Sequence, residues 1–303
     1  MSVTVFTVIK MEIRVLRYFL TVAAEGSISA AAAALHMTQP TLSRQIMQLE
    51  EELGVQLIKR GKRNRRISLT AEGQLLRSRA QELVQLAEKT KAEFKLVEND
   101  IGEVFLAAGE TDAMRYVARA AERMRASYPN LTVHLHSGNS DFVMDQLEKG
   151  LCDFGLLLGM TDEEKYNSLL LPVSDEWGVL TRCDSHLCSL DAVRPLDLLG
   201  VPLMVSQQAA SSRELSAWLG DIGERLKIVG SYNLILNASK FVAEGYGSAL
   251  CLKNLVPPSR ELRFIPFSPG LKANIYIVWK KYQMLSPAAS RFFDCFLQEL
   301  SSL

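Results

Sequence analysis

Six basic side chains fall within eight consecutive residues of this chain, residues 59–66, and no acid lies among them. Ammonium and guanidinium groups at this density can neutralise the phosphates of a nucleic acid. A charged run by itself is more often a solvated surface, so the neighbouring segments must decide between the two uses. Residues 55–58 and 67–69 are rich in apolar side chains and can pair as short strands. The pattern therefore predicts a basic hairpin.

The segment before this hairpin predicts a helix with hydrogen-bonding side chains on its exposed faces. Thr38 is a candidate N-cap, Pro40 suits the first turn and Gly54 is a stop signal, so the helix should span residues 39–53. Its apolar side chains at i, i+4, i+7 and i+11 should form one buried stripe: Leu42, Ile46, Leu49 and Leu53. Its polar side chains are free of acids until the C-terminal end. Alone, this helix is equally consistent with an ordinary amphipathic surface helix, but before a basic hairpin it is suited to entering a major groove N-terminus first.

Two further helices should complete a compact unit with this one. Ser29 is a candidate cap for an Ala-rich helix over residues 30–35, and residues 36–37 would form the turn into the next helix. An earlier helix over residues 13–24 places Leu16, Phe19, Leu20 and Ala23 on one face. A helix-turn-helix followed by a basic hairpin is a winged helix-turn-helix, whose hairpin can contact phosphates and insert an Arg into a narrow minor groove.

Residues 11–73 resemble the winged helix-turn-helix of LysR-type transcriptional regulators. The matching residues are Leu16-Arg17-Tyr18-Phe19, Glu25-Gly26-Ser27, Ala31-Ala32, Leu35, Thr38-Gln39-Pro40, Leu42-Ser43-Arg44-Gln45-Ile46, Leu49-Glu50, Leu53-Gly54, Leu57, Arg60 and Leu69-Thr70-Ala71-Glu72-Gly73. Ile58 departs from the family, which usually has Phe there, and the hairpin is more basic than in many members. The resemblance continues less tightly to the C-terminus. It implies a DNA-binding dimer, often two dimers in a tetramer, and a regulatory region of two lobes like a periplasmic binding protein with an effector between them.

The residues expected at a DNA duplex are of two kinds. The helix-turn-helix should supply base and phosphate contacts, and the hairpin should supply phosphate and minor-groove contacts. The first set is Ser29, Thr38, Gln39, Pro40, Thr41, Ser43, Arg44 and Gln45, and the second is Arg60, Lys62, Arg63, Arg65 and Arg66.

A long helix is expected next, from a Thr70 cap through residues 71–98. Steps of four and three separate its apolar residues Leu76, Ala80, Leu83, Ala87, Thr90, Phe94 and Val97, which is the 3.5-residue period of a two-helix coiled coil. We expect dimerisation through Leu76, Ala80, Leu83, Ala87 and Phe94, and the alternative is packing on the neighbouring domain. A dimer would place two winged helices on a two-fold-related DNA site.

Alternating strands and helices follow, which predicts an α/β region. Strands are expected over residues 103–108, 131–136, 152–158, 176–181, 202–206, 227–230, 248–252, 262–265 and 274–279, and helices over 112–127, 141–149, 213–219, 234–244 and 287–300. Short loops favour parallel strands with helices on both faces. We expect two Rossmann-like lobes of the periplasmic-binding-protein type, joined by crossing segments near residues 159–161 and 266–268.

Polar loops at the carboxyl ends of these strands are the candidate effector site, because open parallel sheets bind ligands there. The candidate residues are Glu110, Thr111, Asp112, Ser137, Gly138, Asn139, Ser206, Gln207, Tyr232 and Asn233. Singly, residues such as Thr111 and Asn139 are as readily explained as helix caps. The family commonly has small residues where Glu110 and Asp112 stand. These two carboxylates favour an effector with a cation or several hydroxyl donors over a lone carboxylate.

Composition sets the remaining expectations. The 303 residues carry no net charge, but residues 11–100 hold 14 basic and 11 acidic side chains, while residues 101–303 hold 19 and 23. Five cysteines without a CxxC pair give no disulfide framework or metal site. The domains expected are a disordered upstream extension (1–10), the winged helix-turn-helix (11–69), a dimerisation helix (70–99) and the effector-binding region (100–303), with lobe one at about 103–159 and 267–303 and lobe two at about 162–265.

The function expected is sequence-specific DNA binding modulated by a small-molecule effector, in the cytoplasm, without a cofactor and without membrane association. RNA polymerase would be a partner if the outcome is activation. One alternative is a small-molecule binding protein whose DNA-binding domain is vestigial. An enzyme is not expected, because the α/β region has no GxGxxG, P-loop, HExxH or nucleophile elbow.

Overall fold

The computed structural model describes residues 11–59, 67–94, 102–159, 162–207, 209 and 212–302. The chain divides into two compact units, Met1–Ala92 and Glu93–Leu303. Within the described ranges, no helix has both the length and the apolar character needed to cross a membrane.

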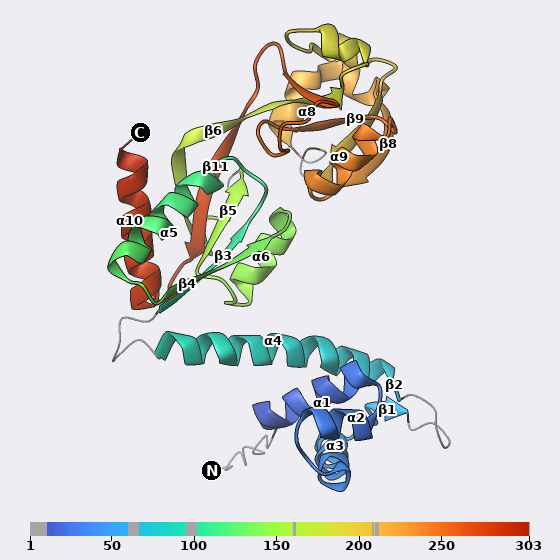
Figure 1. Cartoon of the computed structure of the whole chain (residues 1–303), viewed down its shortest axis with the longest axis vertical. Coiled ribbons are helices and arrows are strands. Elements are labelled where there is room, and N and C mark those ends of the chain that lie inside the picture. Colours follow the sequence, from blue (N-terminus) through green and yellow to red (C-terminus); the bar gives the residue numbers. More distant parts are fainter. Residues whose placement is uncertain are drawn as a thin grey trace, which may run out of the picture. The chain divides into compact units, whose positions relative to one another are not determined.

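The first unit is a three-helix cluster with a two-stranded hairpin and a long helix (Figure 1). Its elements are α1 (Ile13–Glu25), α2 (Ile28–Ala34), α3 (Gln39–Leu53), β1 (Ile58–Lys59), β2 (Ser68–Leu69) and α4 (Ala71–Phe94). Phe19, Val22, Leu42, Ile46 and Leu49 meet in one buried core. β1 and β2 pair antiparallel, with Ile58 opposite Leu69. The helix-turn-helix and the base of the expected hairpin are thereby confirmed.

Two local predictions in this unit are wrong. Ser27, not Ser29, caps α2, since the Ser27 hydroxyl accepts from the Ala30 amide at 3.4 Å. The chain turns early because Gly26 takes a left-handed conformation, φ 63°, which puts Ser29 inside the first helical turn. Leu53 is 39% exposed rather than part of the buried stripe, since it is the last residue of α3 before the chain leaves at Gly54.

The long helix α4 begins as expected, because the Thr70 hydroxyl accepts from the Gly73 amide at 2.9 Å. Its described part ends at Phe94, so the expected end at residue 98 lies outside the described residues. Ala80 is fully buried in the single chain, so it is not part of the exposed apolar surface of α4 on which the predicted seam depends. Leu76 packs against the core of the helix-turn-helix, and Glu88 pairs with Arg17 of α1 at 3.0 Å.

The second unit is built around a sheet in the order β4-β3-β5-β11-β6-β9-β7-β8, with β10 paired to β6. Its first lobe contains β3 (Gly102–Ala108), α5 (Met114–Ser127), β4 (Leu131–Ser137), α6 (Ser140–Glu148), β5 (Phe154–Leu158), β11 (Lys272–Lys280) and α10 (Pro287–Ser301). Helices α5 and α10 cover one face of these strands, and α6 covers the other (Figure 1). β3 is parallel to both β4 and β5.

The second lobe repeats this plan with β7 (Pro202–Ser206), α8 (Arg213–Leu219), β8 (Lys227–Tyr232), α9 (Ile235–Ala243), β9 (Ser248–Leu252) and β10 (Leu262–Pro266). β7 is parallel to β8 and to β9. Leu215 of α8 and Ile235 of α9 pack into separate apolar clusters of this lobe.

One long strand, β6 (Tyr166–Arg182), runs through both lobes. Its first half pairs antiparallel with β11, up to Glu176 opposite Lys272, and its second half pairs with β9 and β10, starting from Trp177 opposite Leu252. The first crossing therefore lies within β6 near residues 176–177, not near 159–161, and residues 166–176 lie in the sheet of lobe one. The sheet is mixed rather than purely parallel because β6, β10 and β11 run antiparallel to their neighbours.

Candidate functional site

The N-terminal half of α3 presents a row of polar side chains to solvent. Thr38, Gln39, Thr41 and Arg44 are exposed, as is Pro40, while Ser43 and Gln45 are half-buried. The Thr38 and Thr41 hydroxyls lie 2.7 Å apart, and the Gln45 amide donates to Gln48 at 3.2 Å. Since buried Leu42, Ile46 and Leu49 hold the opposite face, these polar groups stay available to an external partner.

Glu50 fastens the base of the hairpin to the end of α3, a role that the sequence did not reveal. Its Oε1 accepts hydrogen bonds from the amides of Leu57 at 2.8 Å and Ile58 at 3.2 Å. A carboxylate at the end of a polar helix looks like surface charge in sequence. The chain reversal after Gly54 brings the two amides to it.

Three more contacts fix the hairpin base. The Thr70 hydroxyl donates to the Gln56 carbonyl at 2.7 Å, and the Ile67 amide donates to the Gly26 carbonyl at 2.8 Å. Gly73 packs so closely that a Cβ there would lie 2.0 Å from the Leu57 carbonyl oxygen. The two hairpin strands therefore start from a base that these contacts hold in place. The residues predicted to contact DNA from the hairpin lie outside the described residues: Arg60, Lys62, Arg63, Arg65 and Arg66.

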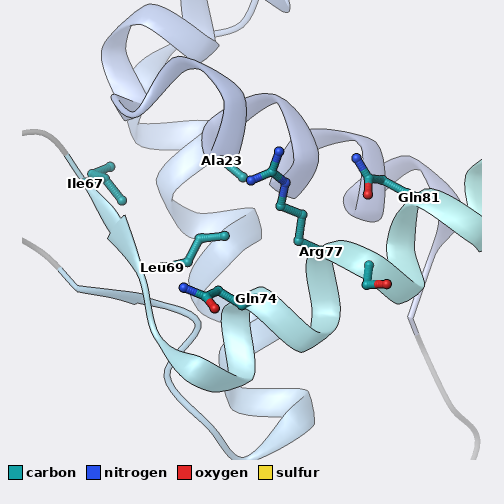
Figure 2. A pocket seen from close by; sticks show the side chains of 7 residues that line it. Ala23, Ile67, Leu69, Gln74, Arg77 and Gln81 are labelled. Atoms are coloured by element: carbon teal, nitrogen blue, oxygen red, sulfur yellow. The ribbon is translucent and has the colours of Figure 1, made fainter. Parts of the chain in front are cut away.

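A hollow of about 490 Å³ lies beside this base, between the end of α1, β2 and the first turns of α4 (Figure 2). Figure 2 shows the Arg77 side chain extending from α4 towards Ala23 of α1. The lining is polar on its α4 side and small or apolar elsewhere: Ala23, Ile67, Leu69, Gln74, Arg77, Ser78 and Gln81. Nothing in the sequence pattern predicted it.

The exposed apolar side chains of α4 differ from the predicted seam. Leu75, Leu83 and Leu86 are 64%, 37% and 40% exposed. Of the predicted set, Leu83 and half-buried Ala87 remain accessible, while the side chain of Phe94 lies outside the described ones. The exposed stripe differs from the predicted one because Leu76 packs against the core of the helix-turn-helix and Ala80 is buried.

In the second unit, Glu110 follows β3 in lobe one and reaches α9 in lobe two. Its Oε2 accepts from the Ile235 amide at 2.6 Å. Burial raises the pKa of the Glu110 carboxyl, while hydrogen bonds from the amides of Ile235 and Leu236 act in the opposite direction. Glu110 is thus at the candidate cleft, as expected, but it already has a partner across it.

Its neighbours in the same loop are also engaged. The Asp112 carboxylate pairs with Arg115 and accepts from the side-chain Nδ2 of Asn254 in lobe two at 3.3 Å. The Thr111 hydroxyl accepts from the Ala113 amide at 3.1 Å and hydrogen-bonds to buried Asp175. Burial raises the pKa of the Asp175 carboxyl, against the opposing hydrogen bonds from Thr111 and from the Asp112 amide.

Asn139 makes a further bridge between the lobes. Its side-chain oxygen caps α6 by accepting from the backbone amide of Phe142 at 3.0 Å, and its side-chain nitrogen donates to the side-chain oxygen of Gln207 at 3.2 Å. Gly138 is needed for packing, because a Cβ there would lie 2.2 Å from the Phe142 ring. The structure therefore shows Asn139 as a helix cap and as a link between the lobes, while its contact with an effector stays a prediction.

Two cavities flank Glu110. One of about 30 Å³ is lined by Glu110, Leu158, Trp177, Ser206, Tyr232, Asn233, Ile235, Cys251, Leu252 and Leu255. The other, of about 300 Å³, is lined by Ala108, Gly109, Glu110, Thr111, Asp112, Met114, Arg115, Leu135, Ser137, Asn254 and Leu255. The predicted loops thus meet here, although Gly138, Asn139 and Gln207 are not among the lining residues. The sequence reasoning missed Trp177, which lies within the strand β6, and Asn254 and Leu255, which lie in the turn after β9.

Several predicted effector residues have intramolecular partners at this point. The Tyr232 hydroxyl donates to the Leu250 carbonyl at 2.5 Å, and the Ser206 hydroxyl accepts from the Ala209 amide at 2.9 Å. The Asn233 side chain accepts from the Leu234 amide at 2.9 Å. In the described part of the chain, no three His, Cys, Asp or Glu side chains are grouped to hold a metal ion.

Two family models match the chain. The model of the LysR substrate binding domain matches residues 98–301, and that of the bacterial regulatory helix-turn-helix protein, lysR family, matches residues 13–74. Among curated relatives, the HTH-type transcriptional regulator BsdA of Bacillus subtilis (strain 168) is 26% identical over 302 residues, which is 94% of this chain and 100% of the relative. The HTH-type transcriptional regulator ClcR of Pseudomonas putida is 34% identical over 146 residues, 48% of this chain and 49% of the relative.

Solved structures share the fold. Full-length CbnR, crystallised in complex with its target DNA, superposes with a TM-score of 0.77 at 22% identity, covering 95% of this chain and 100% of that chain. The Corynebacterium glutamicum OxyR C206 mutant gives a TM-score of 0.55 at 21% identity, covering 96% and 91%.

Proposed function

Because the chain belongs to the LysR family of DNA-binding transcription regulators with an effector-binding domain, we propose which of its surfaces perform these two tasks. The N-terminal half of α3 enters the major groove, where Gln39, Thr41, Ser43 and Arg44 contact bases and phosphates. The hairpin contacts phosphates and the adjacent minor groove through its arginines and Lys62. The observation that carries this proposal is the exposed, acid-free polar row on α3, directly before the braced base of a basic hairpin.

The protein acts in the cytoplasm as a homodimer that is built on α4, and two such dimers form a tetramer. The exposed leucines Leu75, Leu83 and Leu86 supply an apolar stripe that a second α4 would cover. A dimer presents two copies of α3 to two half-sites, so it binds DNA more tightly than one copy could. RNA polymerase is a partner if the bound regulator activates.

The effector binds between the two lobes, beside the loop of residues 109–112 in lobe one and that of 254–255 in lobe two. The cavity of about 300 Å³ there is within the size range of small-molecule sites. An effector controls DNA binding only by its different affinity for two arrangements of the protein. Bridges such as Asn139–Gln207 and Asp112–Asn254 depend on how the lobes sit, so they can transmit that difference.

Binding of the full-length protein to the region upstream of its own gene tests the DNA-reading surface. Fluorescence anisotropy against this fragment and against an unrelated fragment should give a tighter dissociation constant for the upstream fragment. Arg44→Ala should weaken that binding roughly 10-fold or more, since a specific base contact contributes about 1–3 kcal/mol. Arg125→Ala removes the same charge from the exposed surface of α5 in the second unit and is the matched control.

Equal affinity of the Arg44 and Arg125 variants would remove α3 from the interface. Absence of any preference for the upstream fragment, at low and at moderate salt, would favour the alternative of a small-molecule binding protein with a vestigial DNA-binding domain.

A further inference from the structure

Helix α9 lacks an N-terminal cap of its own. Its N-cap residue is Leu234, whose side chain makes no capping hydrogen bond. The first amides of a helix have no partner within the helix and usually receive one from Ser, Thr, Asp or Asn at this position. Here Glu110, 125 residues earlier in the chain, accepts from the Ile235 amide at 2.6 Å and from the Leu236 amide. The missing cap of a lobe-two helix is therefore supplied by lobe one.

The capping group is also an anion at the positive end of a helix. A helix N-terminus attracts negative charge through its free amides and its dipole, and carboxylate or phosphate ligands commonly use such a site. Among the described residues, none of those that line the smaller of the two cavities beside Glu110 has a cationic side chain. The amides of α9 are thus the chief partners of this carboxylate, and the cavity of about 30 Å³ beside it leaves little room for a second anion.

We propose that Glu110 is a specificity-determining residue of the effector cleft: an internal anion that occupies the N-terminus of α9, joins the two lobes and excludes carboxylate and phosphate effectors from that position. The effector of this protein is then neutral or cationic at the end that faces Glu110. This inference rests on the proposed effector site between the lobes. It concerns which ligands that site accepts, and it makes no use of how the protein contacts DNA.

Removal of the internal anion should create a site for an external one. In Glu110→Ala the α9 amides are exposed to a vacated space, and formate or acetate can enter it. We therefore expect Glu110→Ala to unfold about 2–4 °C lower than the wild type in chloride, as for the loss of one helix cap from a domain of this size. Formate or acetate, titrated at constant ionic strength, should raise the midpoint saturably and restore most of the loss.

Three proteins serve as controls in the same titration. The wild type and Glu110→Gln should not respond to formate or acetate beyond the response to chloride, because a side chain still fills the site. Gln207→Ala removes the Asn139–Gln207 bridge between the lobes without vacating an anion position, so it should not respond either. If Glu110→Ala is obtained unfolded in chloride, its refolding is compared in formate and in chloride at the same ionic strength. Recovery of folded protein only in formate supports the proposal, and recovery in neither salt overturns it.

Two further results would overturn the proposal. One is a Glu110→Ala response to formate and acetate that equals that of the wild type. The other is saturation of the wild-type protein by a simple dicarboxylate such as succinate at micromolar concentration. DNA binding, measured in parallel by anisotropy, tests the proposed function separately. If neither the wild type nor any variant bound DNA, the proposed function would be refuted, while the carboxylate titration would still test the role of Glu110.

Discussion

Removal of the Glu50 carboxylate should release the hairpin base from α3. Its Oε1 receives the amides of Leu57 and Ile58 at 2.8 and 3.2 Å. These two residues are only 1% and 3% exposed, so their amides have little access to water when the carboxylate is absent. A hydrogen bond to a charged group contributes about 1.5–3 kcal/mol, and because two amides share one oxygen we take ~2 kcal/mol for the pair. This corresponds to roughly 30-fold in the local opening equilibrium.

Hydrogen exchange measured by mass spectrometry on the full-length protein tests this value. In Glu50→Ala, exchange of the amides of residues 57 and 58 should be roughly 30-fold faster than in the wild type, while the core amides of α1 are unchanged. DNA affinity should fall for specific and unrelated duplexes alike, because a loosely held hairpin neutralises phosphates less effectively. Glu51→Ala removes the same charge from the next, exposed residue and should do neither. Equal exchange in the two variants would refute the assignment of Glu50.

Three further predictions concern charge, pH and association. An Arg65→Ala/Arg66→Ala double variant should lower the slope of log affinity against log salt by about one for each lost phosphate contact, and an unchanged slope would remove the hairpin from the interface. Burial raises the folded-state pKa of Asp175, so the folded chain binds the proton more tightly, and stability should fall as pH rises from the ordinary Asp pKa through the raised one. Asp175→Asn should make that fall smaller in thermal unfolding curves recorded across pH, and the remaining fall should include the contribution of Glu110, whose carboxyl pKa burial also raises. A Leu83→Glu/Leu86→Glu variant should be monomeric in light scattering and bind its DNA fragment at least 10-fold more weakly, since each copy then binds alone; a stable dimer would contradict the α4 interface.

The elements of the DNA-binding unit could be predicted from sequence because they depend on local signals. Thr38, Pro40 and Gly54 bound α3 as expected, and the spacing of Leu42, Ile46 and Leu49 identified its buried face. The errors fell at the ends of elements. Leu53 continues the apolar stripe in sequence but has no neighbour to cover it, and the left-handed Gly26 moved the cap of α2 from Ser29 to Ser27.

A second limit on prediction from the sequence was that one residue pattern can serve two structural roles. A 3.5-residue apolar period on α4 fits both a coiled coil and packing on a neighbouring domain. In the structure Leu76 packs on the core of its own unit, while Leu83 and Leu86 remain exposed, so dimerisation through α4 stays a prediction. Likewise β6 crosses the two lobes as one strand, and its first half was missed because its polar and apolar residues do not alternate regularly.

The sequence by itself determined most of the elements and the polar loops, because helix caps, apolar periodicity and turn residues act over a few positions along the chain, and its motifs between residues 11 and 73 indicated the family by resemblance. Only the tertiary structure decided what the charged side chains do there. Glu50 and Glu110 look like surface acids in sequence, yet one holds the hairpin base and the other caps a helix 125 residues away. The partner of a carboxylate is set by the amides that folding brings within hydrogen-bonding distance. The separation of two residues along the chain does not reveal how close they lie in the folded protein.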